Sequence, residues 1–160
     1  MIAIISDIHD NLANLKTALD NATTKQAEVL FVLGDVTNAE TLNYIATNFK
    51  NKIYLVSGNM EVCDLKAESK KYTNIIYLGR QGGIVKINNK LVGICHEPFL
   101  ANDLIKQKAQ IIFYGHTHKP FEETKNGVQL INPGNLANVF YAPSFALWDE
   151  QTNKLELKIL

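Results

Sequence analysis

Two histidines separated by a single residue, His116 and His118, directly follow an apolar run. Alternate side chains of an extended chain share a face, so these imidazoles are predicted to point at one spot. Asp7 and His9 have the same spacing after an apolar run near the N-terminus. One such pair is more often a structural or solvated feature than a ligand pair. Two pairs in one chain favour a metal site.

Every histidine of the chain belongs to a polar group that follows an apolar run. The members of these groups are Asp7, His9, Asp35, Asn59, His96, His116 and His118. Ligands of open α/β sheets bind beyond the carboxyl ends of the strands, where all these groups are predicted to lie. Taken singly, Asp35 and Asn59 are compatible with turn residues and His96 with a strand-end histidine. The shared placement of all the histidines favours one site.

These side chains comprise two carboxylates, four imidazoles and one carboxamide. Such a mixture suits zinc, manganese, iron or nickel better than calcium, and it requires no thiolate. It exceeds one tetrahedral site and suits two metals about 3.5–4 Å apart with a bridging carboxylate, an arrangement used for in-line displacement at phosphorus. Two divalent ions and two carboxylates leave two positive charges. A hydroxide and a monoanionic phosphodiester would neutralise them, although the nearby carboxylates of Glu61 and Glu97 could alter this charge balance.

The composition sets limits on partners and location. The chain has 160 residues, with 16 basic and 16 acidic side chains, so no charge field indicates binding to nucleic acid or a membrane surface. Arg80 is the only arginine, so a phosphate cannot be held mainly by bidentate arginine contacts, and a metal ion is the better candidate for binding it. Cys63 and Cys95 are too few for a disulfide framework, and the start at Met1 lacks a signal sequence, so we expect a cytoplasmic protein.

The first part of the chain predicts the elements that position the site. Buried strands are expected over 2–6, 29–33 and 53–56, and helices are expected to begin after the capping residues Asn11 and Asn38. The predicted apolar helix faces contain Leu12, Leu15, Leu19 and Ala22, and then Leu42, Ile45, Ala46 and Phe49. This alternation predicts a parallel sheet with helices on its faces.

The remaining chain has shorter, mostly apolar runs. We expect weak helix over 62–72, a short helix over 103–108 and a strand over 111–114. Hairpins are expected from 83–87 with 91–95, from 121–124 with 128–131 around Asn126-Gly127, and from 145–148 with 155–159. No linker interrupts these elements, so residues 1–160 are expected to form one domain.

In the order of its motifs, the chain resembles the calcineurin-like metallophosphoesterase family, and within it the small bacterial and archaeal phosphodiesterases. The motifs are Asp7-Ile8-His9, Gly34-Asp35, Gly58-Asn59 with Glu61, His96, Gly115-His116-Thr117-His118 and Asn132-Pro133-Gly134. Ordered blocks over nearly the whole chain are far more specific than one short motif. The resemblance implies an α/β fold, a two-sheet αββα sandwich with the metal site at the sheet edges.

The resemblance also implies roles for individual residues. One metal would take Asp7, His9 and His118, the other Asn59, His96 and His116, with Asp35 bridging. The implied cofactors are two divalent metal ions, manganese before nickel, zinc, iron or magnesium, and a hydroxide between them would attack phosphorus in line. Catalytic roles would fall to Asp35, Asn59 and His96, and substrate binding to Asn11 and Asn59.

The implied activity is that of a phosphodiesterase with a small phosphorylated substrate. The sequence leaves the oligomeric state open, with a homo-oligomer as one alternative. A phosphomonoesterase of the same mechanism and a catalytically silent, protein-binding scaffold are the alternatives, and a hydrolase of non-phosphate esters is a more distant one. An exposed apolar patch from Phe99-Leu100, Phe121 and Val139-Phe140-Tyr141 would favour the scaffold, although core or dimer contacts are the commoner use of such residues.

Several residues depart from the family pattern. Met60 stands where many relatives have a histidine that protonates the leaving oxygen, and it either signals a preference for good leaving groups or packs beneath the site. Asp10 replaces a glycine, Glu97 stands where a histidine-glycine-histidine motif is usual, and Asn135 replaces a frequent serine. Cys95 is expected to be a buried strand-end residue. These differences leave the metal centre intact and the substrate open.

Overall fold

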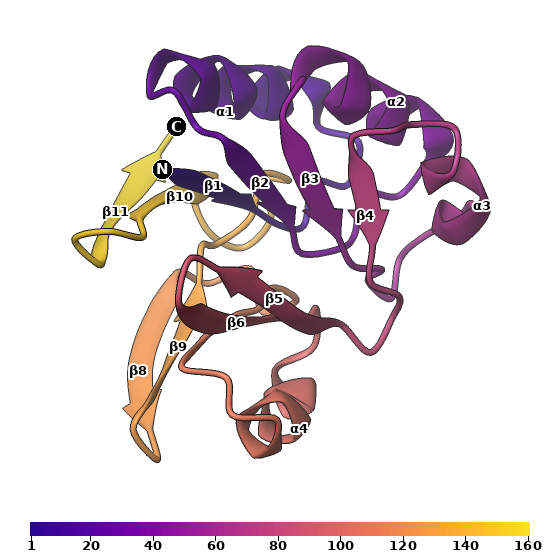
Figure 1. Cartoon of the computed structure of the whole chain (residues 1–160). Coiled ribbons are helices and arrows are strands. Elements are labelled where there is room, and N and C mark those ends of the chain that lie inside the picture. Colours follow the sequence, from indigo (N-terminus) through magenta and orange to yellow (C-terminus); the bar gives the residue numbers. More distant parts are fainter.

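The computed structural model describes residues 1–160, which form two packed β-sheets (Figure 1). The strands of the first sheet are β1 (Ile2–Ile5), β2 (Val29–Val32), β3 (Lys52–Leu55), β4 (Ile75–Tyr77), β10 (Ser144–Asp149) and β11 (Lys154–Ile159). Their order is β11-β10-β1-β2-β3-β4, and β1 to β4 run parallel. The alternation of strands and helices predicted this for β1 to β3, whereas β4 was not predicted.

Helices α1 (Leu12–Thr24), α2 (Ala39–Asn48) and α3 (Leu65–Ser69) belong to the first sheet's layer, and α1 and α2 lie along its outer face in Figure 1. The side chains of Asn11 and Asn38 accept hydrogen bonds from backbone N–H groups of the first turns, so both predicted N-caps are confirmed. Leu12, which the sequence placed on the apolar face of α1, is not buried. It is 44% exposed, because it lies in the first turn, ahead of the buried stripe that begins at Leu15.

The second sheet contains β5 (Gly83–Ile87), β6 (Lys90–Ile94), β7 (Ile111–Phe113), β8 (Phe121–Lys125) and β9 (Val128–Asn132), in the order β5-β6-β7-β9-β8. Asn126 and Gly127 have φ angles of 53° and 77°, which is the left-handed pair that a two-residue hairpin requires. A 3-10 turn (Pro98–Leu100) leads into α4 (Ala101–Lys106), which therefore begins and ends two residues before the predicted 103–108.

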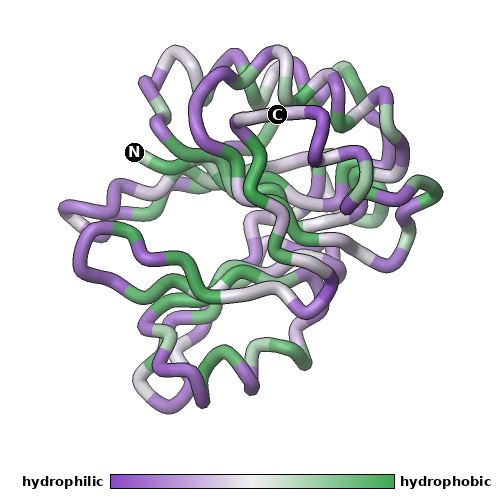
Figure 2. Tube along the Cα trace, turned by 45° about the vertical axis from the view of Figure 1, so that its right-hand side comes forward, coloured by the Kyte–Doolittle hydropathy of each residue, from purple (hydrophilic) through white to green (hydrophobic).

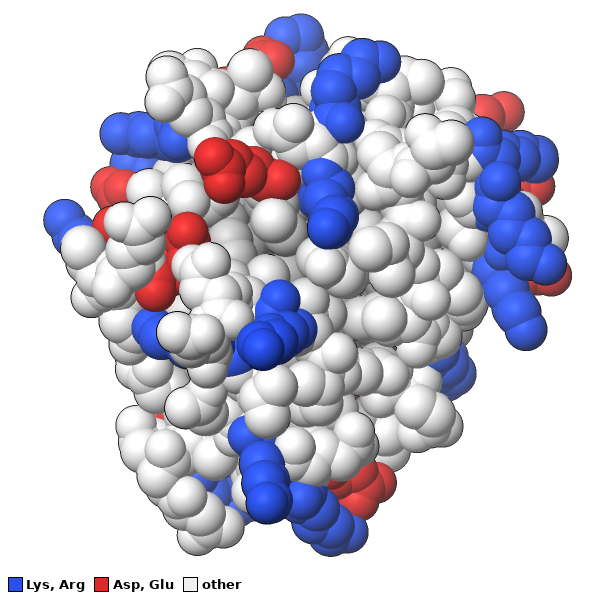
Figure 3. Space-filling view, in the orientation of Figure 1, with Lys and Arg blue, Asp and Glu red and all other residues white.

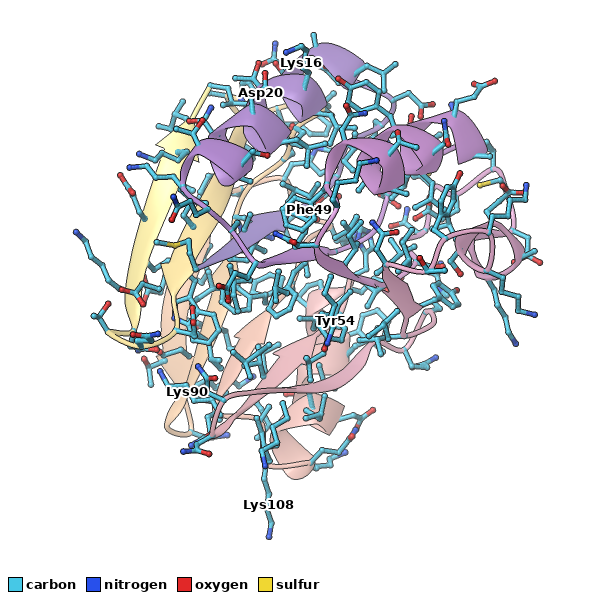
Figure 4. All side chains as sticks on the ribbon, turned by 45° about the horizontal axis from the view of Figure 1, so that its top comes forward. Lys16, Asp20, Phe49, Tyr54, Lys90 and Lys108 are labelled. Atoms are coloured by element: carbon cyan, nitrogen blue, oxygen red, sulfur yellow. The ribbon has the colours of Figure 1, made fainter.

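The core consists of three apolar layers. One lies between α1, α2 and the first sheet, the second between the two sheets, and the third between the second sheet and α4. Strand β3 shows how the layers are filled: Ile53 and Leu55 enter the first, whereas Tyr54 packs against the second. Figure 4 shows Phe49 and Tyr54 on opposite sides of this strand, and the buried strands are the apolar parts of the trace in Figure 2. The layers therefore follow the αββα order that the family resemblance implies.

The surface carries both signs of charge. Figure 3 shows basic and acidic side chains distributed over the face in view, with large uncharged areas between them. Lys16 and Asp20 on the outer side of α1, labelled in Figure 4, form an ion pair of 2.6 Å. The structure contains no helix with the length and apolar character needed to cross a bilayer.

Candidate metal centre

The loops that follow β1, β2, β3, β6 and β7 meet at one edge of the sandwich. Backbone hydrogen bonds tie them together: the N–H of Asp7 donates to Gly34 O over 3.1 Å, and the N–H of Gly115 donates to His96 O over 3.0 Å. The second of these bonds joins two loops of the second sheet, and the first joins two loops of the first. All the side chains predicted to bind metal project from these loops.

The first group of side chains consists of Asp7, His9 and His118, whose donor atoms lie within 4.8 Å of one another. His118 Nε2 is 3.4 Å from Asp7 Oδ1, and the rings of His9 and His118 are 5.3 Å apart. The Asp7 carboxylate is fully buried and accepts hydrogen bonds from Ser6 Oγ and from the backbone N–H of His116. These donors fix its position while leaving it directed at the two imidazoles.

The second group is built around the carboxamide oxygen of Asn59. Its Oδ1 atom lies 3.0 Å from His96 Nε2 and 2.8 Å from His116 Nδ1, and the two rings are 5.2 Å apart. His96 is fully buried, whereas Asn59 and His116 are exposed to solvent. The group therefore has a rigid inner member and an accessible outer side.

Asp35 lies between the two groups. Its Oδ2 atom is 3.5 Å from His9 Nε2 and 3.4 Å from His96 Nε2, so one carboxylate oxygen faces a histidine of each group. The other oxygen, Oδ1, accepts a hydrogen bond of 2.8 Å from the backbone N–H of Met60. This is the position that a bridging carboxylate occupies between two cations.

The paired histidines do not point at one spot, which corrects the prediction from their spacing. His116 and His118 have φ angles of 68° and 60°, so the loop is left-handed at both residues rather than extended. As a result His116 joins Asn59, and His118 joins Asp7. Asp7 and His9 do enter one group, although their φ angles of 50° and 43° are also left-handed.

Two backbone carbonyls fix the orientation of the inner imidazoles. Leu33 O lies 2.7 Å from His96 Nδ1, and Val139 O lies 3.4 Å from His118 Nδ1. Because a carbonyl oxygen only accepts, each Nδ1 atom donates to it, and each Nε2 atom faces the centre, where it could bind a cation after losing its own proton. This is the usual arrangement around a metal-binding histidine.

The groups also shift one another's protonation. Burial would raise the pKa of Asp35, but the hydrogen bond and charge of His96, with smaller effects of Met60 N–H and His9, outweigh burial and lower it. Burial would lower the pKa of His96, yet Asp35 and Asp7 raise it overall. The hydrogen bond to Asp7 is the largest cause of the raised pKa of His118, and burial opposes it. The Asp7 and Asp35 carboxylates therefore favour positive charge at the neighbouring imidazoles.

One atom in the centre lacks a partner, which tests whether a metal fits. His9 Nε2 is buried and forms no hydrogen bond, although Asp35 lies nearby. A buried nitrogen without a partner costs free energy, and a cation between it and the carboxylate would remove that cost. Imidazole nitrogens with carboxylate and carboxamide oxygens are suitable donors for transition metals. The residues present therefore fit metal binding.

Comparison with known proteins decides the family. Residues 1–153 match the calcineurin-like phosphoesterase superfamily domain. The chain belongs to this family. Membership places it among metal-dependent hydrolases of phosphoesters.

Two curated proteins of Methanocaldococcus jannaschii are similar to this metallophosphoesterase. One, a phosphodiesterase, is 28% identical over 140 residues, which cover 83% of this chain and 82% of the relative. The other, named a probable metallophosphoesterase, is 25% identical over 146 residues, covering 84% of this chain and 67% of the relative.

Solved structures share the fold. An archaeal phosphodiesterase superimposes with a TM-score of 0.88 at 23% identity, over 99% of both chains. Vacuolar protein sorting 29 from Cryptosporidium parvum has a TM-score of 0.68 at 20% identity, over 99% of this chain and 95% of its own. The E. coli phosphoesterase YfcE has a TM-score of 0.67 at 19% identity, over 99% of this chain and 98% of its own. The predicted αββα sandwich is confirmed.

Glycines allow the loops of this metallophosphoesterase to approach one another. A Cβ atom at Gly58 would overlap the Asp35 carboxylate, and one at Gly115 would overlap Ser6 Oγ. Glu61 ties the same loops, because its carboxylate accepts hydrogen bonds from the backbone N–H groups of Gly58, Val36 and Thr37. The absence of a side chain at Gly58 and Gly115 is therefore what lets these loops pack closely.

The residues that depart from the family pattern have identifiable surroundings. Asp10 accepts a 2.6 Å hydrogen bond from Thr41 Oγ1, and Glu97 is paired with the Arg80 guanidinium, which also donates to Gly58 O. Asn11 caps α1 and donates to Ala137 O, so its substrate-binding role stays a prediction. Cys95 is fully buried, as predicted, and burial raises the pKa of its thiol to about 12.

Met60 does not pack beneath the centre, which excludes one of the two sequence interpretations. It is 54% exposed and forms part of the wall of a hollow of about 410 Å³. The hollow is lined by His9, Asp35, Asn59, Met60, His116, His118, Val139 and Phe140. Five of these side chains are predicted metal ligands, so the hollow opens directly onto the centre.

Sequence reasoning missed three contributors to the site. The carbonyl groups of Leu33 and Val139 orient histidines, and Ser6 holds the Asp7 carboxylate. The position of Ser6 beside the first motif was the only signal available for it. Backbone carbonyls leave no signal in the residue types, so the other two contacts required the structure.

Proposed function

We propose that this chain is a phosphodiesterase that works with two divalent metal ions, with manganese as the first candidate. The observation that carries the proposal is the position of Asp35, whose Oδ2 atom faces His9 of one group and His96 of the other. A carboxylate shared in this way is the feature that distinguishes a two-metal site from a single site. The named relatives that are phosphodiesterases support the same activity.

The two groups of side chains divide the metals between them. Asp7, His9 and His118 would hold one ion, Asn59, His96 and His116 the other, and Asp35 would contact both. When bound, two such ions lower the pKa of water to provide a nucleophile at neutral pH and neutralise charge on the phosphoryl oxygens. The protein contributes fixed geometry, since Leu33 O and Val139 O hold two of the imidazoles in place.

Charge favours a diester over a monoester. Two divalent ions and two carboxylates leave two positive charges, which a hydroxide and a monoanionic diester would neutralise. A dianionic monoester would need a further cationic side chain, and no lysine or arginine lines the hollow. Arg80 is committed to Glu97 and Gly58 O, and the Glu61 carboxylate faces backbone N–H groups instead of the hollow.

The protonation of the leaving oxygen is assigned to solvent. Met60 has no proton to give, and its side chain is exposed at the wall of the hollow rather than shielding it. Water therefore has access to the position where relatives carry the histidine. This supports a preference for diesters whose leaving groups depart readily as anions.

The test uses metal-stripped protein and bis(4-nitrophenyl) phosphate, with 4-nitrophenyl phosphate as the monoester. Hydrolysis of the diester should require added manganese and should fall by at least about 100-fold in Asp35→Asn. Asp20→Asn on the outer side of α1 is the matched control and should retain activity. Preference for the monoester would overturn the diester assignment, and equal activity of Asp35→Asn would overturn the two-metal site.

A protein-binding scaffold is the second candidate, favoured by the exposure of Phe140 and Tyr141 beside the centre. It would be supported if manganese, nickel and zinc all failed to produce hydrolysis. We also propose a cytoplasmic protein of one domain acting on a small phosphorylated substrate, supported by the free thiols of Cys63 and Cys95 and by the core shared between the sheets.

A further inference from the structure

Apolar side chains form one wall of the hollow beside the metal centre. Phe140 is 88% exposed, Met60 54% and Val139 41%, and all three line the hollow with the histidines. Large apolar side chains gathered beside a polar site commonly mark a place where a ligand binds. We call Met60, Val139 and Phe140 the apolar wall.

The loop that carries Val139 and Phe140, two members of the apolar wall, is fixed to the metal centre. Asn135 is fully buried, and its side chain donates to His118 O over 3.0 Å and to Tyr141 O over 3.3 Å. Its Oδ1 atom accepts from the N–H of Val139, and Val139 O accepts from the ring of His118. Val139, Tyr141 and His118 are therefore held in one hydrogen-bonded unit, which fixes the backbone on both sides of Phe140.

The conformation of Phe140 is unfavourable for the free protein. Its φ angle is 67°, in the left-handed region that bulky L residues rarely adopt, and its ring is almost entirely in water. Strained residues persist where surrounding contacts impose them and are frequent at binding sites. The ring lies 5.9 Å from the ring of His118 at an angle of 60°, so it borders the place where a phosphoryl group would bind.

The composition of the hollow restricts what the wall can recognise. Apart from the predicted metal ligands, its lining consists only of the apolar wall, without a lysine or an arginine. A substrate group that extends from the phosphorus along this wall gains contact with an aromatic face, a thioether and a branched side chain. Aromatic groups gain most from such contacts, through ring stacking and through sulfur–aromatic contact.

We propose that the apolar wall is a subsite for an aromatic ester group of the substrate, with Phe140 as the residue that determines this preference. The inference rests on the proposed function, because it places the phosphoryl group at the metal centre. It deepens that function by naming the substrate class: phosphodiesters in which an aromatic ring, either an aryl group or a nucleobase, lies within reach of Phe140.

Calorimetric binding to manganese-loaded protein tests the subsite without relying on turnover. The monomethyl esters of phenylphosphonate and methylphosphonate offer the same monoanionic phosphonate to the metals and differ only in the organic group. Both are monoanions, as the proposed diester substrates are. The phenyl compound should bind about tenfold more tightly, and this preference should fall to about twofold in Phe140→Ala. Phe140→Tyr should keep the preference, because it retains the aromatic face.

Phe99→Ala is the matched control, because Phe99 is also exposed, at 67%, but does not line the hollow. Thermal unfolding and manganese binding of Phe140→Ala establish that the variant is folded and loaded. A parallel titration with the monoanionic methyl ester of adenosine 5′-monophosphate separates the two ring sources. A larger effect of Phe140→Ala on the phenyl probe would indicate an aryl group, and a larger effect on the adenosine probe would indicate a nucleobase.

Failure of the subsite and failure of the proposed function give different results. If both phosphonates bind, but with a ratio that Phe140→Ala leaves unchanged, the subsite is overturned and the phosphoryl site stands. If Phe99→Ala reduces the ratio as much as Phe140→Ala, the effect is not local and the subsite is likewise overturned. If neither phosphonate binds the loaded protein, the proposed function itself fails.

Discussion

The Nδ1 atom of His96 lies 2.7 Å from the carbonyl oxygen of Leu33, at the end of the neighbouring sheet's strand β2. The next residue, Gly34, has a φ angle of 101°, and a Cβ atom added there would lie 2.7 Å from the same nitrogen. One loop of the first sheet thus both orients a histidine of the second sheet and leaves room for its ring. The contact joins the two halves of the centre across the sandwich.

This relationship predicts different effects of alanine at two glycines. Gly79 also has a positive φ angle, 80°, but a Cβ atom there would contact nothing within 4 Å. Gly79→Ala should therefore lower the free energy of unfolding by about 1–2 kcal/mol through backbone strain alone. Gly34→Ala should cost about 1–3 kcal/mol more, because His96 and the Gly58 backbone must shift.

Urea denaturation of both variants provides the measurement, and hydrolysis assays should show that Gly34→Ala alone reduces activity. Equal losses of stability in the two variants would show that the centre accommodates a methyl group beside His96. In that case the ring would not be held in the way the 2.7 Å contact indicates.

A second prediction concerns Arg80, whose side chain supports the loop that carries Asn59. Its guanidinium donates to Gly58 O and pairs with Glu97. Glu97 is 5% exposed, and one of its carboxylate oxygens has no hydrogen-bond partner. Arg80→Ala should lower the free energy of unfolding by about 1–3 kcal/mol, because it leaves a buried carboxylate unpaired. The partial exposure of Arg80 places the expected value in the lower half of that range.

A double-mutant cycle with Glu97→Gln checks this explanation. Adding Glu97→Gln to Arg80→Ala should recover part of the lost stability, because the unpaired charge is removed. Activity should remain reduced in the double variant, because Gly58 O has still lost its donor and Asn59 is less well placed. Additive losses of stability in the cycle would contradict the pairing.

Much of the site could be predicted because each side chain follows an apolar strand. The alternation of strands and helices placed Asp7, Asp35 and Asn59 after neighbouring parallel strands, and parallel strands end at one edge. The caps Asn11 and Asn38 were predictable for a similar local reason, since a carboxamide before an apolar periodic run is a helix start signal.

Other features depended on tertiary contacts. The three residues of β4 are too few to show a period, and the strand forms through pairing with β3. The separation of His116 from His118 depends on left-handed backbone, which tertiary hydrogen bonds impose and which residue types do not reveal. The exposure of Phe140 was equally hidden, since an aromatic residue between apolar neighbours is more often part of a core.

The shifted pKa values predict how metal-free protein responds to pH. The pKa values of His96 and His118 are raised above the ordinary 6.5, so their stabilising contribution is complete below about pH 6.5 and is lost as the pH rises through the raised values. The pKa of Asp35 is lowered below 3.8, so its contribution is complete above about pH 3.8 and is lost as the pH falls through the lowered value.

Metal-free protein should therefore be most stable between about pH 4 and pH 6.5. Metal binding requires neutral imidazoles, so the stabilisation by manganese should grow as the pH rises from about 6 to 8. Thermal unfolding of stripped and loaded protein across this range measures both effects. A manganese-induced shift in Tm that stays constant with pH would show that the histidines do not release protons on binding.

The exposed position of Met60 predicts that a histidine there could protonate the leaving group. Met60 lines the hollow and is 54% exposed, so Met60→His replaces a solvent-facing side chain without disturbing the core. The backbone N–H of residue 60 would still donate to Asp35 Oδ1, as it does now over 2.8 Å.

General acid catalysis contributes about 10²–10⁴-fold where a proton must be delivered, so turnover of diesters with alkoxide leaving groups should rise markedly in Met60→His. Diesters that release 4-nitrophenolate should gain little, because that anion departs without a proton, and Met60→Gln serves as the polar control. An equal change for both leaving groups would show that Met60 does not mark a missing acid.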